Sequence, residues 1–182
     1  GNQAALESRQ AVELLRMCLD AGYDRAQTLT AVNGMMLLAG QGERFTTVDL
    51  FLLDLWTGKA SLDKLGAAGS YLMQAEGLSL LGGDALPLGI LENVESGEKL
   101  MQLHQGDTLI LLSDGVEDAY ENRQSMEETI RDALTLETAQ DAANAILTGA
   151  QSGDTAPADD QTVLVLRLIR ARANAKIEEM YQ

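Results

Sequence analysis

Residues 107–118 read Asp-Thr-Leu-Ile-Leu-Leu-Ser-Asp-Gly-Val-Glu-Asp, an apolar run that ends in acidic residues. Residues 158–166 read Ala-Asp-Asp-Gln-Thr-Val-Leu-Val-Leu, an apolar run that begins with acidic residues. Short apolar runs bounded by turn residues predict buried strands. If these two strands pair as antiparallel neighbours, the end of the first meets the start of the second at one edge of a sheet. That edge would hold the carboxylates of Asp114 and Asp159.

Two carboxylates at one edge suit a hard divalent cation such as Mg²⁺ or Mn²⁺, which prefers oxygen ligands. Gly115 follows the first of them and Asp160 follows the second. Strand ends and turns also carry aspartate for another reason, because its side chain hydrogen-bonds the local backbone. Spacing alone favours this turn interpretation, so the metal hypothesis depends on the surrounding sequence.

The surrounding sequence resembles a known family. Residues 109–118 are similar to the late metal motif of the Mg²⁺/Mn²⁺-dependent (PP2C-like) serine/threonine phosphatases, and residues 159–162 look like their final one. Further landmarks resemble one bacterial branch, the stage II sporulation protein E family. They are residues 45–58, Phe-Thr-Thr-Val-Asp-Leu-Phe-Leu-Leu-Asp-Leu-Trp-Thr-Gly, residues 64–70, Lys-Leu-Gly-Ala-Ala-Gly-Ser, and residues 86–91, Leu-Pro-Leu-Gly-Ile-Leu. Their order and spacing follow the family over nearly the whole chain.

The resemblance implies a metal-dependent protein phosphatase with two Mn²⁺ or Mg²⁺ ions, in which a metal-bound water is the nucleophile and no side chain is. Asp114 and Asp159 match metal-binding aspartates of the family. Asp118 matches a position that contacts metal through water or helps hold an extra ion. Asp160 matches a position that in relatives is often not a ligand, and Gly115 would let the backbone pass close to the cluster. No substrate-binding residue is indicated.

The start of the chain departs from the family pattern. The first metal segment of the family reads Asp-Gly-Met-Gly-x-Gly-x-x-Ala, and residues 1–4 look like its tail. The resemblance implies that the aspartate bridging both metals, and an earlier strand, precede this sequence. We expect residues 1–182 to form a single but partial phosphatase domain that binds metal weakly and is inactive by itself.

Composition excludes several classes of function. The chain has 182 residues, enough for one domain, with a formal net charge of -15. Such a charge repels nucleic acid and anionic membranes. One cysteine allows no internal disulfide and fits the cytoplasm, and one histidine argues against a Ser-His-Asp mechanism. No apolar run reaches the roughly 20 residues of a membrane helix, so any membrane anchor of the parent protein would lie outside this sequence.

Periodicity and capping signals predict an α+β fold, an antiparallel β-sandwich flanked by helical pairs. The expected helices are 4–21, 24–40 with Asp24 as N-cap, one opened by a capping box at 125–128, 138–150 opened by Thr138, and a frayed terminal helix within 170–182. The expected strands are 46–56, 60–65, 70–74, 79–81, 98–103, 107–113 and 161–169.

Three polar residues lie outside the acidic edge but inside the family pattern. Asp49 and Asp54 fall within the expected strand 46–56, where an unpaired charge is costly, so each should find a partner or lie at an exposed end. We interpret both as structural. Ser70 is interpreted as a turn residue.

Two hypotheses of function remain open. The first is a phosphatase domain that acts on a phosphorylated regulatory protein, by resemblance an anti-sigma factor antagonist in sporulation control. The second is a phosphatase-like module that binds a partner without hydrolysis. A homodimer is left open as well, and a third reading, an acidic α+β domain of unknown role, would require several motifs to coincide in order.

Overall fold

Two antiparallel sheets and three groups of helices make up the computed structural model, which describes residues 2–40, 45–94, 97–152 and 159–169. The helices are α1 (Asn2–Asp20), α2 (Arg25–Gly40), α3 (Asp114–Glu117), α4 (Arg123–Ala133) and α5 (Ala139–Ala150). The strands are β1 (Val48–Leu53), β2 (Lys59–Leu65), β3 (Ser70–Gln74), β4 (Gly77–Leu81), β5 (Lys99–Gln102), β6 (Thr108–Leu112) and β7 (Val163–Arg167).

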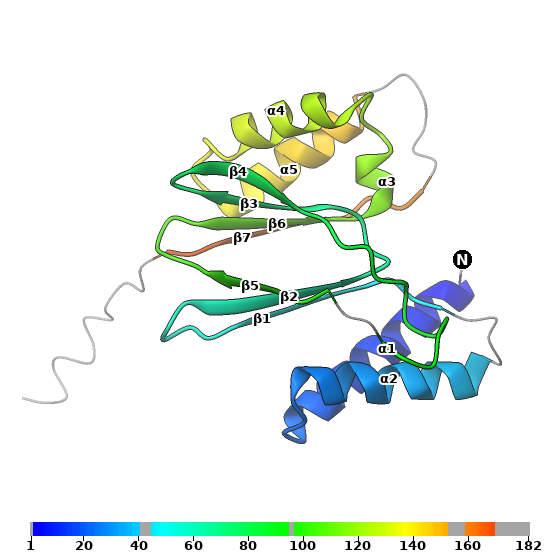
Figure 1. The fold of residues 1–182 in the computed structure, drawn as a ribbon. Coiled ribbons are helices and arrows are strands. Elements are labelled where there is room, and N and C mark those ends of the chain that lie inside the picture. The colour runs from blue at the N-terminus through cyan, green and yellow to red at the C-terminus, as the bar shows by residue number, and fades with distance from the viewer. Residues whose placement is uncertain (1, 41–44, 95–96, 153–158, 170–182) are drawn as a thin grey trace, which may run out of the picture.

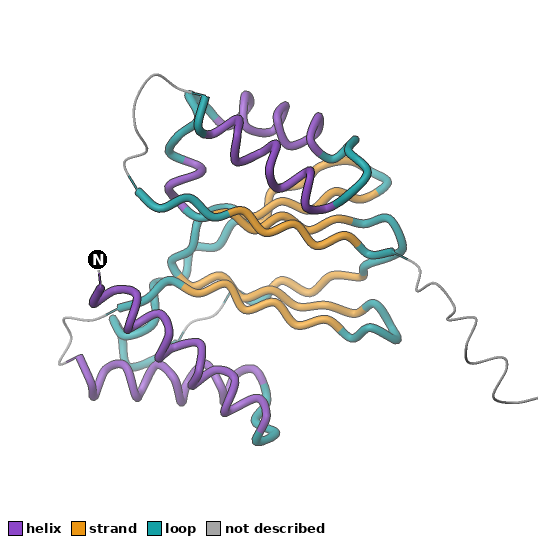
Figure 2. The backbone as a smooth tube through the Cα atoms, turned by 180° about the vertical axis from the view of Figure 1, so that it is seen from behind, coloured by secondary structure: helices purple, strands orange, loops and turns teal. Residues whose placement is uncertain are grey.

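The sheets are stacked face to face, with helices on the outer sides (Figure 1). One sheet has the strand order β1-β2-β5 and the other has the order β4-β3-β6-β7. The α4–α5 pair covers the outer face of the second sheet, and the α1–α2 pair lies against one end of the first, as the view from behind also shows (Figure 2). The predicted α+β sandwich flanked by helical pairs is confirmed.

Strand β6 explains why this layering buries the core. Its alternate residues face opposite sides, so Leu109 packs between the sheets while Ile110 and Leu112 pack under α4 and α5. A third cluster joins α1 and α2 to the first sheet through Leu29, Val32, Val48, Leu50 and Leu65. β6 is covered on both faces, which is why it reads as an unbroken apolar run from Leu109 to Leu112.

Two of the predicted helix starts are confirmed by their hydrogen bonds. Asp24 Oδ1 accepts from the backbone N–H of Gln27 (2.8 Å), and Gln27 Oε1 accepts from that of Asp24 (3.0 Å). Thr138 Oγ1 accepts from the backbone N–H of Asp141 (3.0 Å). Both are N-caps that satisfy amide groups left free by helix geometry.

The predicted capping box at 125–128 is wrong. The N-cap of α4 is Asn122, whose side chain accepts from the backbone N–H of Ser125 (3.0 Å). Asparagine caps at least as well as serine, so the helix begins at Arg123. Ser125 instead lies in the first turn and donates its hydroxyl to the carbonyl of Asn122 (2.8 Å).

The predicted strand 46–56 is too long, because β1 ends at Leu53. Asp54 turns the chain, since its carboxylate accepts from the backbone N–H of Trp56 (2.8 Å) and of Thr57 (3.2 Å). Leu55 and Trp56 therefore lie in an exposed turn rather than in the sheet, and they are 85% and 98% exposed. The expected helix within 170–182 lies outside the described residues. Among the residues described, no helix is long and apolar enough to cross a membrane.

A buried ion pair fastens α2 to the first sheet. Arg25, at the start of α2, donates to the carboxylate of Asp63 in β2, whose side chain is 0% exposed, and also to Glu98 (3.0 Å). A charge held inside a protein is tolerated only when a partner of opposite sign is close. This ion pair therefore holds the N-terminal end of α2 against the first sheet.

Replacing Asp63 should destabilise the protein more than replacing its partially exposed neighbour. Asp63→Asn leaves Arg25 without its buried anion and should lower the free energy of unfolding by about 3 kcal/mol. Glu98→Gln, as the matched control, should cost less than about 1 kcal/mol because Glu98 is partly exposed to water. Urea unfolding of both variants measures this, and equal losses would contradict the role of Asp63.

Candidate metal centre

The pairing of β6 with β7 brings the two acidic segments to one edge. The strands are antiparallel neighbours, which is the condition on which the predicted edge depends, and Leu112 lies opposite Val163. Pairing continues one residue further, since the backbone N–H of Ser113 donates to the carbonyl of Thr162 (3.0 Å). Asp114 directly follows Ser113 in one strand, and Asp160 lies two residues before Thr162 in the other. The acidic residues therefore start where the sheet ends.

Gly115 allows α3 to lie directly on the segment before β7. A Cβ atom at this position would lie 2.6 Å from the carbonyl oxygen of Asp160, which is too close without a shift of the backbone, and 3.2 Å from that of Asp159, which is a tight contact. Ser113 Oγ donates to the carbonyl of Asp160 (3.1 Å), and Gln161 Nε2 donates to the carbonyl of Gly115 (3.0 Å). The absence of a side chain at Gly115 thus lets two backbone segments lie close together, and its predicted role beside a metal cluster stays a prediction.

Asp114 and Asp159 are exposed, and among the described residues one carboxylate oxygen of each accepts a hydrogen bond. Oδ1 of Asp114 accepts from the N–H of Gly115 (2.9 Å), and Oδ1 of Asp159 accepts from the N–H of Asp160 (2.7 Å). Within the described part of the chain, no hydrogen bond engages the second oxygen of either group. Each carboxylate is oriented by one local bond and has a free oxygen for a cation.

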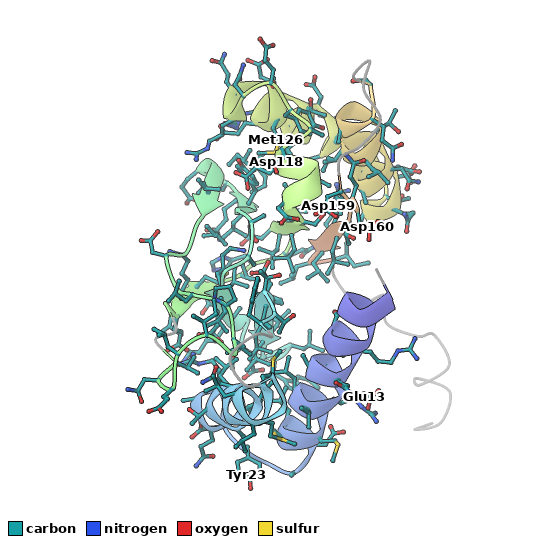
Figure 3. The ribbon with its side chains drawn as sticks, turned by 90° about the vertical axis from the view of Figure 1, so that its right-hand side faces the viewer. Glu13, Tyr23, Asp118, Met126, Asp159 and Asp160 are labelled. Carbon is teal, nitrogen blue, oxygen red and sulfur yellow. The ribbon has the colours of Figure 1, made fainter. Side chains whose placement is uncertain are left out.

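Asp118 and Asp160 lie beside this pair. Asp118 is exposed at the C-cap of α3, where its N–H donates to the carbonyl of Asp114 (2.8 Å). Figure 3 shows Asp118 on this short helix, with Asp159 and Asp160 on the segment beneath it. Asp160 is exposed too, and its backbone carbonyl accepts a hydrogen bond from the hydroxyl of Ser113. All the acids predicted at the edge are thus in one region of the molecule.

These residues fit part of a metal site. Within residues 2–40, 45–94, 97–152 and 159–169, no three His, Cys, Asp or Glu side chains gather as a metal-binding group. The donor chemistry, exposed carboxylates with free oxygens, is nevertheless that of a Mg²⁺ or Mn²⁺ site. Metal binding at this edge would therefore need oxygen donors beyond these carboxylates.

A cleft of about 270 Å³ opens beside Asp114, between the ends of the two sheets. Asp49 of β1 reaches it from the three-stranded sheet, and Asp114 reaches it from the end of the four-stranded one. The other residues of its wall are Thr47, Gly66, Ala67, Ala68, Leu111, Leu112, Ser113, Thr162 and Leu164. Of the candidate ligands, Asp114 thus borders a hollow that could admit a substrate group.

A buried polar network ties the two sheets together behind this cleft. Lys64 of β2 is 0% exposed and is the register partner of Asp49 in β1. Its Nζ donates to Asp49 Oδ1 (2.6 Å) and to Ser70 Oγ (2.9 Å), which belongs to β3 in the other sheet. Asp49 has thus found the partner that burial requires, and Asp54 lies at an exposed end, as predicted for both.

The prediction that Ser70 is a turn residue is wrong. Ser70 is buried and begins β3. The turn is made by the residues just before it, with Gly66 at a φ of 67°, a left-handed conformation that glycine adopts without strain. The hydroxyl of Ser70 is therefore free to reach across to the other sheet.

Burial raises the pKa of the Asp49 carboxyl above its usual value of 3.8, and the ammonium group of Lys64 lowers the pKa by a smaller effect. A carboxyl whose pKa is raised on folding stabilises the fold most in its protonated form. This contribution is present below pH 3.8 and is lost as the pH rises through the raised pKa.

Sequence analysis missed three residues that build the site. The sequence does contain a signal for Lys64, because a lysine inside a strand that is expected to be buried must have a polar or charged partner. Gln161 lies in the family motif, and its amide holds the carbonyl of Gly115. Glu117 accepts from the backbone N–H of Gly69 (3.2 Å) and so links α3 to the loop that lines the cleft. No local pattern in the sequence indicates that last contact.

The family model of stage II sporulation protein E (SpoIIE) matches residues 1–169 of the chain. The chain belongs to the SpoIIE family. The stage II sporulation protein E of Priestia megaterium is 29% identical over 116 residues, which cover 64% of this chain and 20% of that protein. This SpoIIE-family chain therefore spans a fifth of the length of that curated relative.

Solved structures agree with the PP2C-like fold predicted from the sequence. The PP2C phosphatase domain of SpoIIE from Bacillus subtilis, solved with a fragment of its regulatory domain, superposes with a TM-score of 0.78 and 26% identity, covering 90% of this chain and 50% of that one. The catalytic domain of the serine/threonine phosphatase PstP, in complex with two manganese ions, gives a TM-score of 0.70 at 20% identity and covers 89% of this chain and 82% of that one.

Adding a single methyl group at Gly115 should disturb the edge. Gly115→Ala forces α3 away from the carbonyl of Asp160 and should lower the free energy of unfolding by about 1–3 kcal/mol. Gly34→Ala is the matched control, because a Cβ atom there meets nothing within 4 Å and alanine favours a helix, so stability should rise by up to about 1 kcal/mol. Thermal unfolding compares the two, and a neutral Gly115→Ala would refute the close contact.

Removing the ammonium group should shift the titration of its partner. In Lys64→Met the pKa of Asp49 should rise further, because the group that lowers it is gone and burial remains. Ser70→Ala should raise the pKa less, since its hydroxyl contributes least among the causes. Carboxyl-carbon NMR titration measures both, and a lower pKa in Lys64→Met would contradict the network.

Proposed function

We propose that this SpoIIE-family chain is part of a metal-dependent protein phosphatase that removes phosphate from serine or threonine of a regulatory protein. One observation carries the proposal: the pairing of β6 with β7 brings Asp114 and the Asp159 segment to one edge of a PP2C phosphatase fold, where Asp114 lines a cleft. The relatives support it, since two solved neighbours are a PP2C phosphatase domain and the catalytic domain of a serine/threonine phosphatase.

The residues of the edge take separate roles in this proposal. Asp114 and Asp159 would hold the cation directly through their free oxygens, and Asp118 would contact it through water. Gly115 and Asp160 complete the candidate set, because α3 lies against the carbonyl of Asp160 at the position where Gly115 has no side chain. A bound Mn²⁺ or Mg²⁺ would neutralise charge on the phosphoryl oxygens and supply an activated water.

The substrate in this proposal is a phosphorylated protein of sigma factor control, of the anti-sigma factor antagonist type. The support is membership of a family named for sporulation. The open cleft fits a phosphorylated side chain presented by a protein, since its rim is formed by loop and strand ends rather than by a closed pocket. The strongly negative chain disfavours nucleic acid as a partner.

Removing either edge carboxylate should abolish hydrolysis. In the full-length protein, Asp114→Asn or Asp159→Asn should lower the Mn²⁺-dependent kcat/KM for a generic phosphate ester at least a hundredfold, because each removes a charged ligand. Asp132→Asn, on the exposed face of α4, is the matched control and should change little. Full activity of Asp114→Asn or Asp159→Asn at saturating Mn²⁺ would overturn the metal assignment.

A second candidate is a phosphatase-like module that binds a phosphoprotein without hydrolysing it. It is favoured by the fact that no three acids gather within the described residues. The same assay separates the two candidates. Wild-type full-length protein that binds the phosphoprotein but releases no phosphate with either Mn²⁺ or Mg²⁺ would establish the binding module.

A further inference from the structure

Asp49 is an ionisable group on the wall of the cleft that the candidate metal edge does not use. Among the described residues that line the cleft, Asp49 and Asp114 are the two with a carboxyl group. Asp114 is a candidate metal ligand, and a ligand carboxyl must lose its proton to bind a cation. Asp49 comes from β1, in the other sheet. Of these two carboxyls, Asp49 is therefore the one that can carry a proton.

Hydrogen bonds hold Asp49 with one oxygen inward. Its Oδ1 accepts from Lys64 Nζ (2.6 Å), whereas its Oδ2 has, among the described residues, one long contact of 3.5 Å with the hydroxyl of Ser70. The side chain of Asp49 is 14% exposed and that of Lys64 is 0% exposed. The part of this ion pair that a bound molecule can reach is therefore the carboxyl, and Oδ2 is its weakly bonded oxygen.

The surroundings of Asp49 favour a carboxyl that keeps its proton. Burial raises the pKa of Asp49 by more than Lys64 and Ser70 lower it. The charged groups that face Asp49 are Lys64 on β2 and, across the cleft, Asp114 after β6, while Glu117 of α3 accepts from the N–H of Gly69 instead. After a proton is donated, Lys64 remains beside Oδ1 to stabilise the carboxylate. The group can thus both hold a proton and release it.

Hydrolysis of a phosphoserine needs such a proton donor. Negative charge develops on the seryl oxygen as its bond to phosphorus breaks, and an alkoxide is a poor leaving group. A positioned acid that protonates this oxygen typically accelerates a reaction about a hundredfold to ten-thousandfold. The single histidine of the chain, His104, precedes the start of β6, whereas the cleft lies at the end of that strand. Histidine therefore does not supply this proton.

We propose that Asp49 is the general acid that protonates the leaving oxygen of the phosphorylated serine or threonine. This inference rests on the proposed function. In the step, a water oxygen bonds to phosphorus, the bond from phosphorus to the side-chain oxygen breaks, and that oxygen takes the proton from Oδ2 of Asp49. The products are the hydroxyl side chain, inorganic phosphate and the Asp49 carboxylate, which regains a proton from the attacking water. Lys64 and Ser70 are positioning residues for this acid.

The first test varies the leaving group in the full-length protein with Mn²⁺. Phenyl phosphate has a leaving oxygen that needs a proton, whereas para-nitrophenyl phosphate releases an anion that is stable in water. Asp49→Asn should lower kcat/KM at least about a hundredfold for phenyl phosphate and less than about threefold for para-nitrophenyl phosphate. Asp54→Asn is the matched control, because Asp54 follows the opposite end of β1, and it should leave the ratio of the two values unchanged.

The second test keeps the acid and changes its pKa. Asp49→Asn leaves the buried ammonium group of Lys64 without its anion, so a variant that retains Asp49 is needed as well. In Lys64→Met, the basic limb of the pH profile of kcat/KM for phenyl phosphate should move to higher pH, since this limb reports the acid of the free enzyme. The pKa of Asp49, followed by carboxyl-carbon NMR in the metal-free protein, should rise by the same amount.

The outcomes separate this inference from the proposed function. Equal losses on both esters in folded Asp49→Asn, or no loss on either, would overturn the assignment of Asp49 and leave the phosphatase standing. A basic limb that stays in place in Lys64→Met while the pKa of Asp49 rises would overturn the assignment too, and would leave the ion pair as a joint between strands. Hydrolysis of neither ester by the wild type would refute the proposed function and this inference together.

Discussion

The antiparallel pairing of β6 with β7 is the interaction on which the candidate site depends. Leu112 lies opposite Val163, and a shift of one residue would turn every side chain of β7 to the other face, so the register is fixed by burial. Beyond the strand ends, Gly115 rests on the carbonyl of Asp160 and extends the contact into α3. Asp114 and Asp159 are consequently held at one edge by the backbone, before any cation contributes.

The rest of the molecule supports that edge from two directions. From the other sheet, Lys64 draws Asp49 and Ser70 together and so joins three strands at the floor of the cleft. From α3, Glu117 holds the N–H of Gly69, which fixes the loop on the rim. A buried ammonium group with two oxygen partners is costly to separate, so the network keeps the two sheets at a constant distance where the cleft opens.

Sequence patterns predicted which helices and strands form better than they predicted the first and last residues of each. Apolar periodicity located the helices and strands, and Asp24 and Thr138 marked two helix starts through their capping bonds. The errors arose where a side chain bonds the backbone nearby. Asp54 ends β1 before Leu55, and Asn122 starts α4 earlier than Ser125 would. The edge itself followed from strand polarity, whereas the link from Lys64 to Ser70 did not, because the stacking of two sheets leaves no local pattern in the sequence.

The metal-dependent function proposed for this edge requires that one cation binds both edge carboxylates. Anomalous diffraction from Mn²⁺-soaked crystals of the full-length protein is the most direct measurement. It should show a manganese peak with oxygen-to-metal distances of roughly 2.0 to 2.6 Å to the carboxylates of Asp114 and Asp159. A peak that contacts neither carboxylate, or no peak at this edge at saturating Mn²⁺, would contradict the central claim.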